Sequence, residues 1–375
     1  MQRAPIVPLA QAQLPAYVQM MSEVFNAPRA ACELSTGRMD AHWVVAEDAR
    51  IQAGFGIYRC AMHMCGADVP VAAVAGVAVA PEARGGGLAG GMMAAALDAF
   101  RAEGLPIAAL YASTLGLYRK VGYEQAGTRV EHRIRTDAIG LADRRLPVRR
   151  VEGAEIAGLV RAWGVVRNGQ LVRSEGLWAR VYSPFVGVTQ SYIVGDGEGW
   201  AVIWQDTTGP HVPWKVRDWG WRTPAAARRL WTLLADAGTM NDHVQWPGPP
   251  TDPMETLLPA VGTEVVGVDR WMVRIVDLPG ALTARGWAED GAIDLDIQDE
   301  TMPENAGRWQ LQVRDRRATV VRGGEGTTAM HIRALASLYT GWHTPDDLAA
   351  IGMIDDPGGI GTLFRAPLPW CADTF

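Results

Sequence analysis

The chain has 375 residues, of which 48% are hydrophobic and 20% are charged, and its formal net charge is −6 at pH 7. This length exceeds one ordinary hydrophobic core, so we expect two or three domains; the balanced composition excludes a collagen, a coiled coil and a largely disordered chain. The acidic excess disfavours a nucleic-acid surface, which needs clustered Lys and Arg, and mildly favours a cationic small substrate.

The cysteines and the apolar runs bear on the compartment. Cys32, Cys60, Cys65 and Cys371 form neither a CxxC pair nor a dense disulfide ladder. The opening residues lack the apolar core and the cleavage site of a signal peptide. The most apolar run, residues 71–80, suits a buried strand and is well short of the ~20 residues of a membrane span. We therefore expect a cytoplasmic protein that binds neither membranes nor nucleic acid.

The first part of the chain predicts alternating helices and strands. Residues 15–25 carry apolar side chains at helical spacing, and this helix should end near Asn26 and Pro28. Strands are expected to follow, the first of them at 42–46. The remaining elements predicted by periodicity and by β-branched content are strands at 42–46, 51–59, 71–80, 107–111 and 128–135 and helices at 88–103 and 115–120.

The rest of the chain predicts two further units. The basic, proline-containing run 140–150 indicates a solvated domain boundary. Ten tryptophans follow within 151–278, and we expect most of them in cores or interfaces. The apolar, aromatic tail 360–375 should dock onto the protein. Elements expected in the third unit are helices at 281–287 and 328–339 and strands at 292–297, 307–313 and 318–322.

The segment VAGVAVAPEARGGGLAGGMM carries the clearest functional signal. A valine-rich strand runs into a glycine-rich turn, Arg84 to Ala89, and then directly into a helix. Glycines let the backbone approach a ligand closely, and the free N–H groups of a first helical turn favour phosphate oxygens. The turn therefore predicts an anion site, to which Arg84 adds a charged donor. A glycine-rich turn that serves only packing is the plainer alternative.

Two other phosphate-binding motifs do not match. GGGLAG lacks the ordered GxGxxG of a dinucleotide fold, with an acidic residue about 20 positions further on, and no Gly-Lys-Ser/Thr of a Walker A loop is present. A second motif, ALYASTLGLYRKVGYEQAG, puts Tyr118 in a short helix after the next strand, followed by a turn at Gly122. Tyr118 is either a packed aromatic or a proton donor, and its position beside the first motif favours the second role.

Together these motifs resemble the GNAT acetyltransferase superfamily, whose signature is (Arg/Gln)-x-x-Gly-x-(Gly/Ala). Over its whole length the chain resembles the enhanced intracellular survival (Eis) acetyltransferases. The resemblance implies a mixed α/β (α+β) fold with tandem GNAT-like domains followed by a sterol-carrier-like C-terminal domain. The implied boundaries are 1–143 for the catalytic, acetyl-CoA-binding domain, 144–278 for a second GNAT-like domain without the motif, and 279–375 for the sterol-carrier-like domain.

The resemblance also assigns site residues. Tyr118 would protonate the departing thiolate, and the carboxylate of Phe375, the last residue of the sequence, would reach the active site as general base. Acetyl-CoA is the implied cosubstrate, with no metal, and the implied assembly is a hexamer. The residues implied to bind acetyl-CoA are Val77, Ala78, Val79, Arg84, Gly85, Gly86, Gly87, Leu88, Ala89, Ser113 and Thr114.

Two departures from the family pattern bear on ligands. The turn has Gly85, Gly86, Ala89 and Gly90 where the family often has arginines, so contacts to the 3′-phosphate of the cofactor should be fewer. Thr374 stands where an acidic residue often precedes the last phenylalanine, which puts recognition of polycationic aminoglycosides in doubt. The acceptor stays open between an aminoglycoside-like polyamine, a lysine side chain and another small amine.

The expected reaction is direct attack of an amine on acetyl-CoA. A base is needed because an ammonium cannot attack, and a terminal carboxylate in an apolar pocket would have a raised pKa. No cysteine lies in a Cys-His context that an acyl-enzyme would need, and the seven histidines show no metal spacing. The alternatives are an acyl- or lipid-binding protein that uses the third domain, and a regulatory protein with a vestigial acetyl-CoA site.

Overall fold

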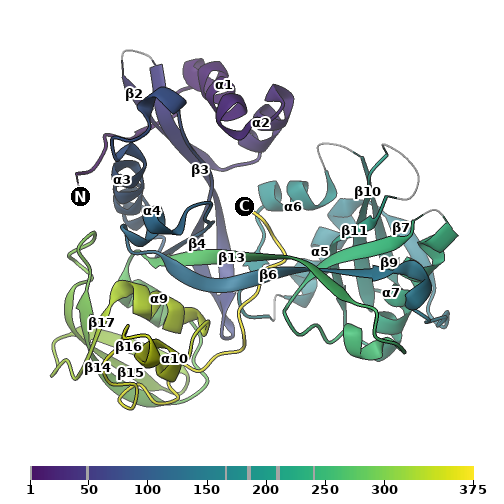
Figure 1. Ribbon diagram of the computed structural model, residues 1–375. Coiled ribbons are helices and arrows are strands. Elements are labelled where there is room, and N and C mark those ends of the chain that lie inside the picture. Colours follow the sequence, from purple (N-terminus) through teal and green to yellow (C-terminus); the bar gives the residue numbers. More distant parts are fainter. Residues whose placement is uncertain (1, 48–49, 165–166, 184–186, 208–211, 240) are drawn as a thin grey trace.

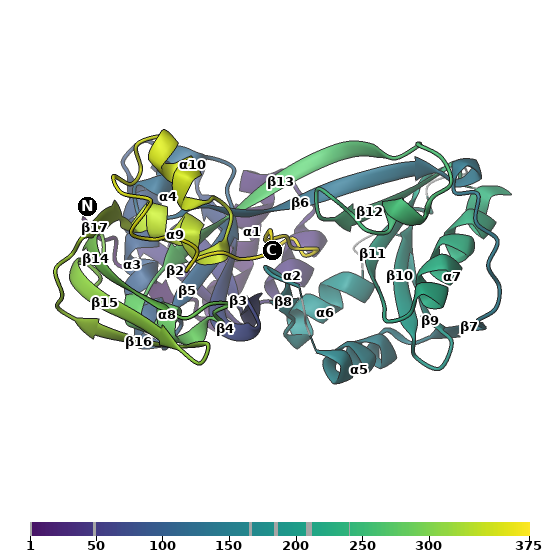
Figure 2. The same ribbon diagram turned by 90° about the horizontal axis from the view of Figure 1, so that it is seen from below.

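The computed structural model describes residues 2–47, 50–164, 167–183, 187–207, 212–239 and 241–375 (Figure 1). We call residues 2–135 the N-terminal region, 148–275 the central region and 278–366 the sterol-carrier region, and 367–375 the C-terminal segment. In the described part of the chain, one 13-stranded sheet runs through the first two regions, and a separate 4-stranded sheet lies in the third. The C-terminal segment ends between the N-terminal and central regions (Figures 1 and 2).

The N-terminal region packs helices against a mixed sheet. Its elements are β1 (Val7–Pro8), α1 (Leu14–Phe25), α2 (Arg29–Thr36), β2 (Ala41–Glu47), β3 (Arg50–Met64), β4 (Ala67–Val79), α3 (Leu88–Ala102), β5 (Ile107–Tyr111), α4 (Leu115–Arg119) and β6 (Glu124–Arg135). The predicted elements are all present, and α2 is a further helix that the sequence did not predict. Proline is tolerated at a helix start, and the Pro28 carbonyl accepts the first helical bond, from Ala31 N–H at 2.9 Å.

Strand β3 continues to Met64, beyond the end of the predicted strand at residue 59, and its two inner glycines lie in tightly packed positions. A Cβ at Gly54 would approach the Trp43 carbonyl oxygen to 3.0 Å, and one at Gly56 would overlap the Met39 sulfur at 2.2 Å. Both glycines therefore mark close approaches of neighbouring chain to an unbroken strand.

The central region repeats a similar mixture of elements. They are β7 (Val148–Val151), α5 (Gly153–Trp163), β8 (Leu171–Val172), α6 (Glu175–Tyr182), β9 (Val188–Val194), β10 (Gly199–Gln205), β11 (Trp214–Trp221), α7 (Pro224–Ala235), β12 (His243–Gly248) and β13 (Glu264–Ile275). The basic run 140–150 ends inside β7, which pairs with β9. Most of the tryptophans are buried, as predicted: Trp178, Trp200, Trp219, Trp231, Trp246 and Trp271.

Strands β6 and β13 join the two regions into one sheet. The described strands follow the order β1-β2-β3-β4-β5-β13-β6-β12-β11-β10-β9-β7, with β8 paired to β3. The end of β13, Trp271 to Ile275, pairs antiparallel with the whole of β5. A strand from residue 264 onward therefore completes the sheet begun by the N-terminal region, and Figure 2 shows β6 and β13 spanning both regions. The domain limits 1–143, 144–278 and 279–375 remain a prediction.

The sterol-carrier region is fastened to that sheet by a buried ion pair. Arg274 of β13 is fully buried and donates from Nη2 to both carboxylate oxygens of Asp299 at 2.7 Å. The elements of the sterol-carrier region are α8 (Leu278–Ala284), β14 (Gly291–Gln298), β15 (Gly307–Arg314), β16 (Arg317–Arg322), β17 (Thr328–His331), α9 (Ile332–Thr340) and α10 (Pro345–Ala350). The helix predicted at 328–339 is wrong for its first four residues, because 328–331 pair with β14 as a parallel strand.

The C-terminal segment docks as predicted. Trp370 N–H donates to the Asn168 carbonyl at 3.1 Å, and Cys371 N–H donates to the Thr128 carbonyl at 3.0 Å. Trp370, Cys371 and Asp373 are buried. The segment thereby lies against β6 and extends toward α6 (Figure 1).

Candidate functional site

Strands β4 and β5 separate and open a gap in the sheet. They pair in parallel only at Val71–Ile107, Ala72–Ala108 and Ala73–Ala109, after which β4 continues to Val79 and β5 to Tyr111. Unpaired backbone N–H and C=O groups at such a gap are free to bond an extended ligand.

A bulge in β4 directs the backbone of the valine-rich stretch. Between Gly54–Ala78 and Gly56–Ala75 the register with β3 shifts, leaving the extra residue on β4 next to Gly76, whose φ is +61°. Ala80 N–H donates to the Gln52 carbonyl at 2.8 Å, so the alternation of a strand points the backbone of Val79 away from β3 and toward the gap. Val77 and Val79 are partly exposed, whereas Ala78 is buried.

The glycine-rich turn has the shape of an anion site. Gly85 and Gly87 have φ of +89° and +76°, and a Cβ on Gly85, Gly86 or Gly87 would meet nothing within 4 Å. These glycines therefore serve the backbone conformation, and the space above the turn is open. Helix α3 follows at Leu88, and its first intrahelical bond among the described backbone bonds joins Gly91 N–H to the Gly87 carbonyl. The N–H groups of Leu88, Ala89 and Gly90 thus face outward, where an anion is stabilised by the helix dipole.

Arg84 closes the turn against β4. It is exposed, and its Nε donates to the Val79 carbonyl at 3.2 Å. The guanidinium keeps its other donors available beside the open turn.

Tyr118 lies in the same apolar cluster as Val77, Val79 and Leu88. Its ring is 4% exposed and contacts Tyr123 edge-to-face at 5.9 Å between centroids. Among described residues its hydroxyl has no hydrogen-bond partner, yet it is not among the fully buried polar atoms without one. The hydroxyl therefore reaches accessible space. Burial raises the pKa of Tyr118 to about 12, so the phenol holds its proton at neutral pH.

Ser113 and Thr114 lie between β5 and α4 and are exposed. Thr114 is the N-cap residue of α4, and its side chain makes no capping bond. The loop that ends β5 is therefore exposed at both hydroxyl-bearing residues.

The C-terminal segment brings Phe375 to the end of β5. Its ring meets the ring of Tyr111 edge-to-face at 5.2 Å, and the Tyr111 hydroxyl donates to the Asp373 carbonyl at 2.8 Å. Asp373 is held by Arg173, whose Nε lies 2.8 Å from Oδ1, and the same guanidinium donates to Asp218 at 2.7 Å. Sequence reasoning missed Tyr111, Arg173 and Asp373, since no local motif joins residues 200 positions apart.

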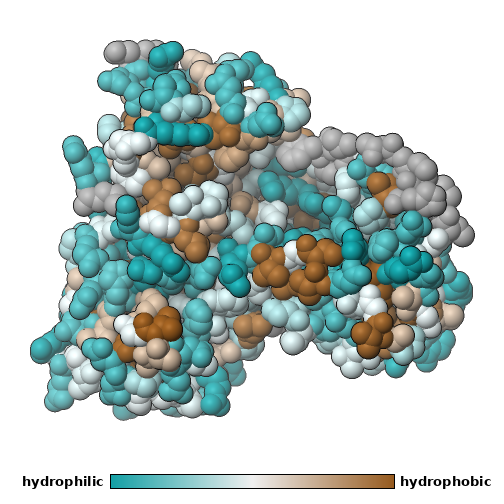
Figure 3. Space-filling view, in the orientation of Figure 1, coloured by the Kyte–Doolittle hydropathy of each residue, from teal (hydrophilic) through white to brown (hydrophobic). Residues whose placement is uncertain are grey.

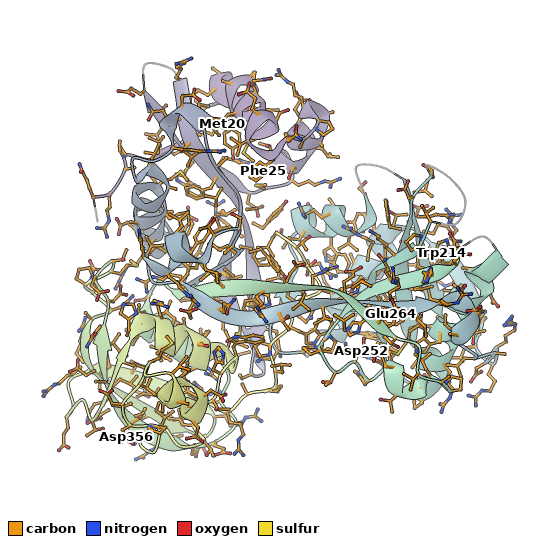
Figure 4. The ribbon with its side chains drawn as sticks, viewed as in Figure 1. Met20, Phe25, Trp214, Asp252, Glu264 and Asp356 are labelled. Atoms are coloured by element: carbon orange, nitrogen blue, oxygen red, sulfur yellow. The ribbon has the colours of Figure 1, made fainter. Side chains whose placement is uncertain are left out.

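The surroundings of the C-terminal segment are more charged than the expected apolar pocket. The ring of Phe375 packs on apolar neighbours, but residues 372–374 line a cavity with several arginines. Figure 4 shows Met20 and Phe25 on α1, in the N-terminal region, and Trp214 on β11, in the central region. The thiols of Cys371 and Cys60 do not suit an acyl-enzyme, because burial raises the pKa of each.

Comparison with protein families finds three matches along the chain. Residues 6–126 and 169–275 each match a model described as an acetyltransferase (GNAT) domain, and residues 278–372 match a sterol carrier protein domain. The two GNAT matches together span the gap, the turn, Tyr118 and most of the central region.

Relatives and solved structures agree with these matches. The chain is 29% identical to N-acetyltransferase Eis of Mycobacterium tuberculosis over 75% of this chain and 73% of that protein. It is 27% identical to an uncharacterized N-acetyltransferase of Streptomyces griseus over 88% and 90%. A GCN5-related N-acetyltransferase structure from Anabaena variabilis has 27% identity and a TM-score of 0.94, covering 99% and 100% of the two chains. Within the described residues, none of the helices has the length and apolar character to cross a membrane.

Proposed function

Because the chain belongs to the Eis-like N-acetyltransferases of the GNAT superfamily, we propose that this enzyme transfers the acetyl group of acetyl-CoA directly to the nitrogen of an amine. The observation that carries the proposal is the gap between β4 and β5 ending at the glycine-rich turn. It joins a backbone edge suited to an extended arm with an N–H-lined turn suited to a pyrophosphate.

The proposed acetyl-CoA site uses these two features in order. The backbone of Val77, Ala78 and Val79 bonds the pantetheine arm and orients the thioester. Arg84 and the backbone from Gly85 to Ala89 hold the pyrophosphate. Ser113 and Thr114 offer hydroxyls from the opposite strand end. The second GNAT match, 169–275, lacks this glycine-rich turn, so we propose a single acetyl-CoA site per chain.

The proposed chemistry needs one base and one acid. The carboxylate of Phe375 accepts a proton from the acceptor ammonium, directly or through water, and the free amine attacks the thioester carbonyl carbon. As the new C–N bond forms and the C–S bond breaks, Tyr118 gives its proton to the leaving sulfur. The new amide nitrogen then loses its second proton, through water, to the Tyr118 phenolate, which restores the phenol. The raised pKa of Tyr118 keeps the phenol protonated until the sulfur departs. Without this donor the sulfur, whose thiol has a pKa of about 8.5, would leave as an unprotonated thiolate.

The Phe375 assignment has its own test. Adding one glycine after Phe375 moves the terminal carboxylate while retaining the ring contact with Tyr111. We expect kcat to fall about 100-fold, as for loss of a general base. The same extension should leave acetyl-CoA affinity unchanged, and an unchanged kcat would remove Phe375 from the mechanism.

A vestigial site is the competing function. Calorimetry with acetyl-CoA separates the two: the enzyme should bind it, and Arg84→Gln should weaken binding about 3- to 10-fold through loss of a charged donor. Thiol release during a screen of small amines then tests transfer. Binding without release for any amine would favour a binding or regulatory role, and a lipid bound in the sterol-carrier region would favour the lipid-binding alternative.

We further propose that the protein assembles as a hexamer, as the family resemblance implies. Supporting this, β13 and the loop before it expose Val261, Val265, Val266 and Val268, and Figure 3 shows an apolar patch over β13 and β6. Exposed patches of this kind mark association sites. Light scattering of Val265→Glu should report smaller assemblies than the parent chain.

A further inference from the structure

A cavity of about 480 Å³ lies where the central region meets the C-terminal segment. Helix α6, strands β6, β11 and β13 and residues 372–374 contribute its walls. Its charged lining consists of Arg129, Arg180, Lys215, Arg217, Glu131 and Asp373. We call it the arginine cavity.

Both acidic side chains of the arginine cavity are already engaged. Glu131 forms an ion pair with Arg129 at 2.5 Å. Asp373 is bound by Arg173, whose side chain is 6% exposed and lies outside the cavity lining. No negative charge of the lining is left over for Arg180 or Arg217.

Arg180 and Arg217 have polar neighbours but no ion pair. Arg217 Nη2 donates to the Arg180 carbonyl at 3.0 Å, and Arg180 Nη2 lies 3.5 Å from the Thr374 hydroxyl. Among the described residues neither guanidinium has a carboxylate within ion-pair distance, and Asp48 is the one acidic residue in the sequence outside those ranges. Burial, and then the charges of Arg180 and Arg129, lower the pKa of Arg217, and the carboxylates of Asp373 and Glu131 offset this in part. The two arginines therefore bring positive charge into the cavity without a directly paired carboxylate among the described residues.

The arginine cavity adjoins the proposed reaction centre. Thr374, which lines it, precedes Phe375, and the ring of Phe375 contacts Tyr111 at the end of β5. Strand β5 is one of the two that separate to form the gap. An acceptor in the cavity can thus present an amine toward the thioester while its other end stays among the arginines.

Partly buried like charges are costly unless an opposite charge joins them, and a guanidinium binds a planar oxyanion through two parallel hydrogen bonds. We propose that the acceptor amine also carries an oxyanion, such as the carboxylate of an amino acid, and that Arg180 and Arg217 bind it. This inference rests on the proposed function and names its substrate class. The same positive field opposes a polycation and favours the uncharged, nucleophilic form of the amine.

The test compares amine acceptors that end in a carboxylate with amides of the same length. The probes are glycine and glycinamide, 4-aminobutanoate and 4-aminobutanamide, and 6-aminohexanoate and 6-aminohexanamide, with spermidine as a polycation. Each is assayed for acetyl-CoA-dependent thiol release, and kcat/KM is determined. In at least one pair the acid should exceed its amide about 10- to 100-fold, the factor expected of charge-assisted hydrogen bonds.

Variants separate recognition from folding. Arg217→Gln and Arg180→Gln should lower kcat/KM for the preferred acid about 10-fold or more and change that for its amide less than about threefold. Arg217→Lys should recover part of the loss, since it restores charge without the bidentate geometry. The control is Arg135→Gln, an exposed arginine paired with Asp137 at the far end of β6, which should leave the preference for the acid unchanged.

The outcomes are distinct. Equal kcat/KM for acid and amide in every pair, or preference for spermidine, overturns the anionic acceptor and leaves acetyl transfer intact. A preference for the acid that survives Arg217→Gln and Arg180→Gln overturns the assignment to these arginines. Absence of acetyl-CoA binding by calorimetry is the separate failure of the proposed function.

Discussion

Replacing Tyr118 by Phe removes one oxygen from a ring that the fold holds tightly. The ring is 4% exposed and keeps its contact with Tyr123, and among described residues the hydroxyl has no protein partner to lose. We therefore expect the free energy of unfolding to change by less than about 0.5 kcal/mol. Acetyl-CoA affinity should also stay nearly constant.

Turnover should respond very differently. A positioned general acid contributes about 10²- to 10⁴-fold, so kcat of Tyr118→Phe should fall at least about 100-fold. The pKa of about 12 keeps the phenol protonated across ordinary assay conditions. An alkaline decline of kcat below about pH 10 in the parent enzyme would thus belong to another group.

Stopped-flow measurement of thiol release at saturating acetyl-CoA gives kcat, and calorimetry gives affinity. The matched control is Tyr123→Phe, which removes a hydroxyl that is buried without a partner in the described structure and should leave kcat unchanged. If Tyr118→Phe turned over at the parental rate with any productive amine, the proton-donor role would be refuted.

Two further predictions concern the fold around the site. Gly76→Ala should lower the free energy of unfolding by about 1–2 kcal/mol because the φ of Gly76 is +61°, and it should weaken acetyl-CoA binding by disturbing the bulge in β4. The control is Gly158→Ala in α5, where a Cβ meets nothing within 4 Å, and thermal unfolding should show it to be neutral or stabilising. Burial lowers the pKa of His42 to about 4, so the parent protein should lose stability as the pH falls from about 6.5 through 4. His42→Leu should lose less stability over this range, and identical pH profiles of the two proteins in denaturant titrations would contradict the prediction.

The sequence predicted the structural elements that are determined by residues close together in the chain. The strand before Arg84, the turn to Ala89 and the helix after it are local, and periodicity with glycine chemistry was sufficient to predict all three. Helix α2 was missed because Pro28 reads as a stop signal, although it begins the next helix.

What the sequence could not supply were contacts between distant positions. The pairing of β13 with β5, the Arg173–Asp373 ion pair and the arginine cavity all join residues far apart in the chain. Nothing in the local pattern around Arg180 or Arg217 distinguishes them from solvated surface arginines. The acidic net charge favoured a cationic acceptor, which stays a prediction, because a total charge carries no information about where charges gather.

The pairing of β13 with β5 has a consequence for how the chain is made. Until residue 275 has left the ribosome, β5 lacks the neighbour that covers one of its edges, and the nascent N-terminal region presents an open strand while more than a hundred further residues are synthesised. The sheet that holds the gap between β4 and β5 thus becomes complete only late in translation. A chain cut after β6 should accordingly aggregate instead of yielding a small independent enzyme.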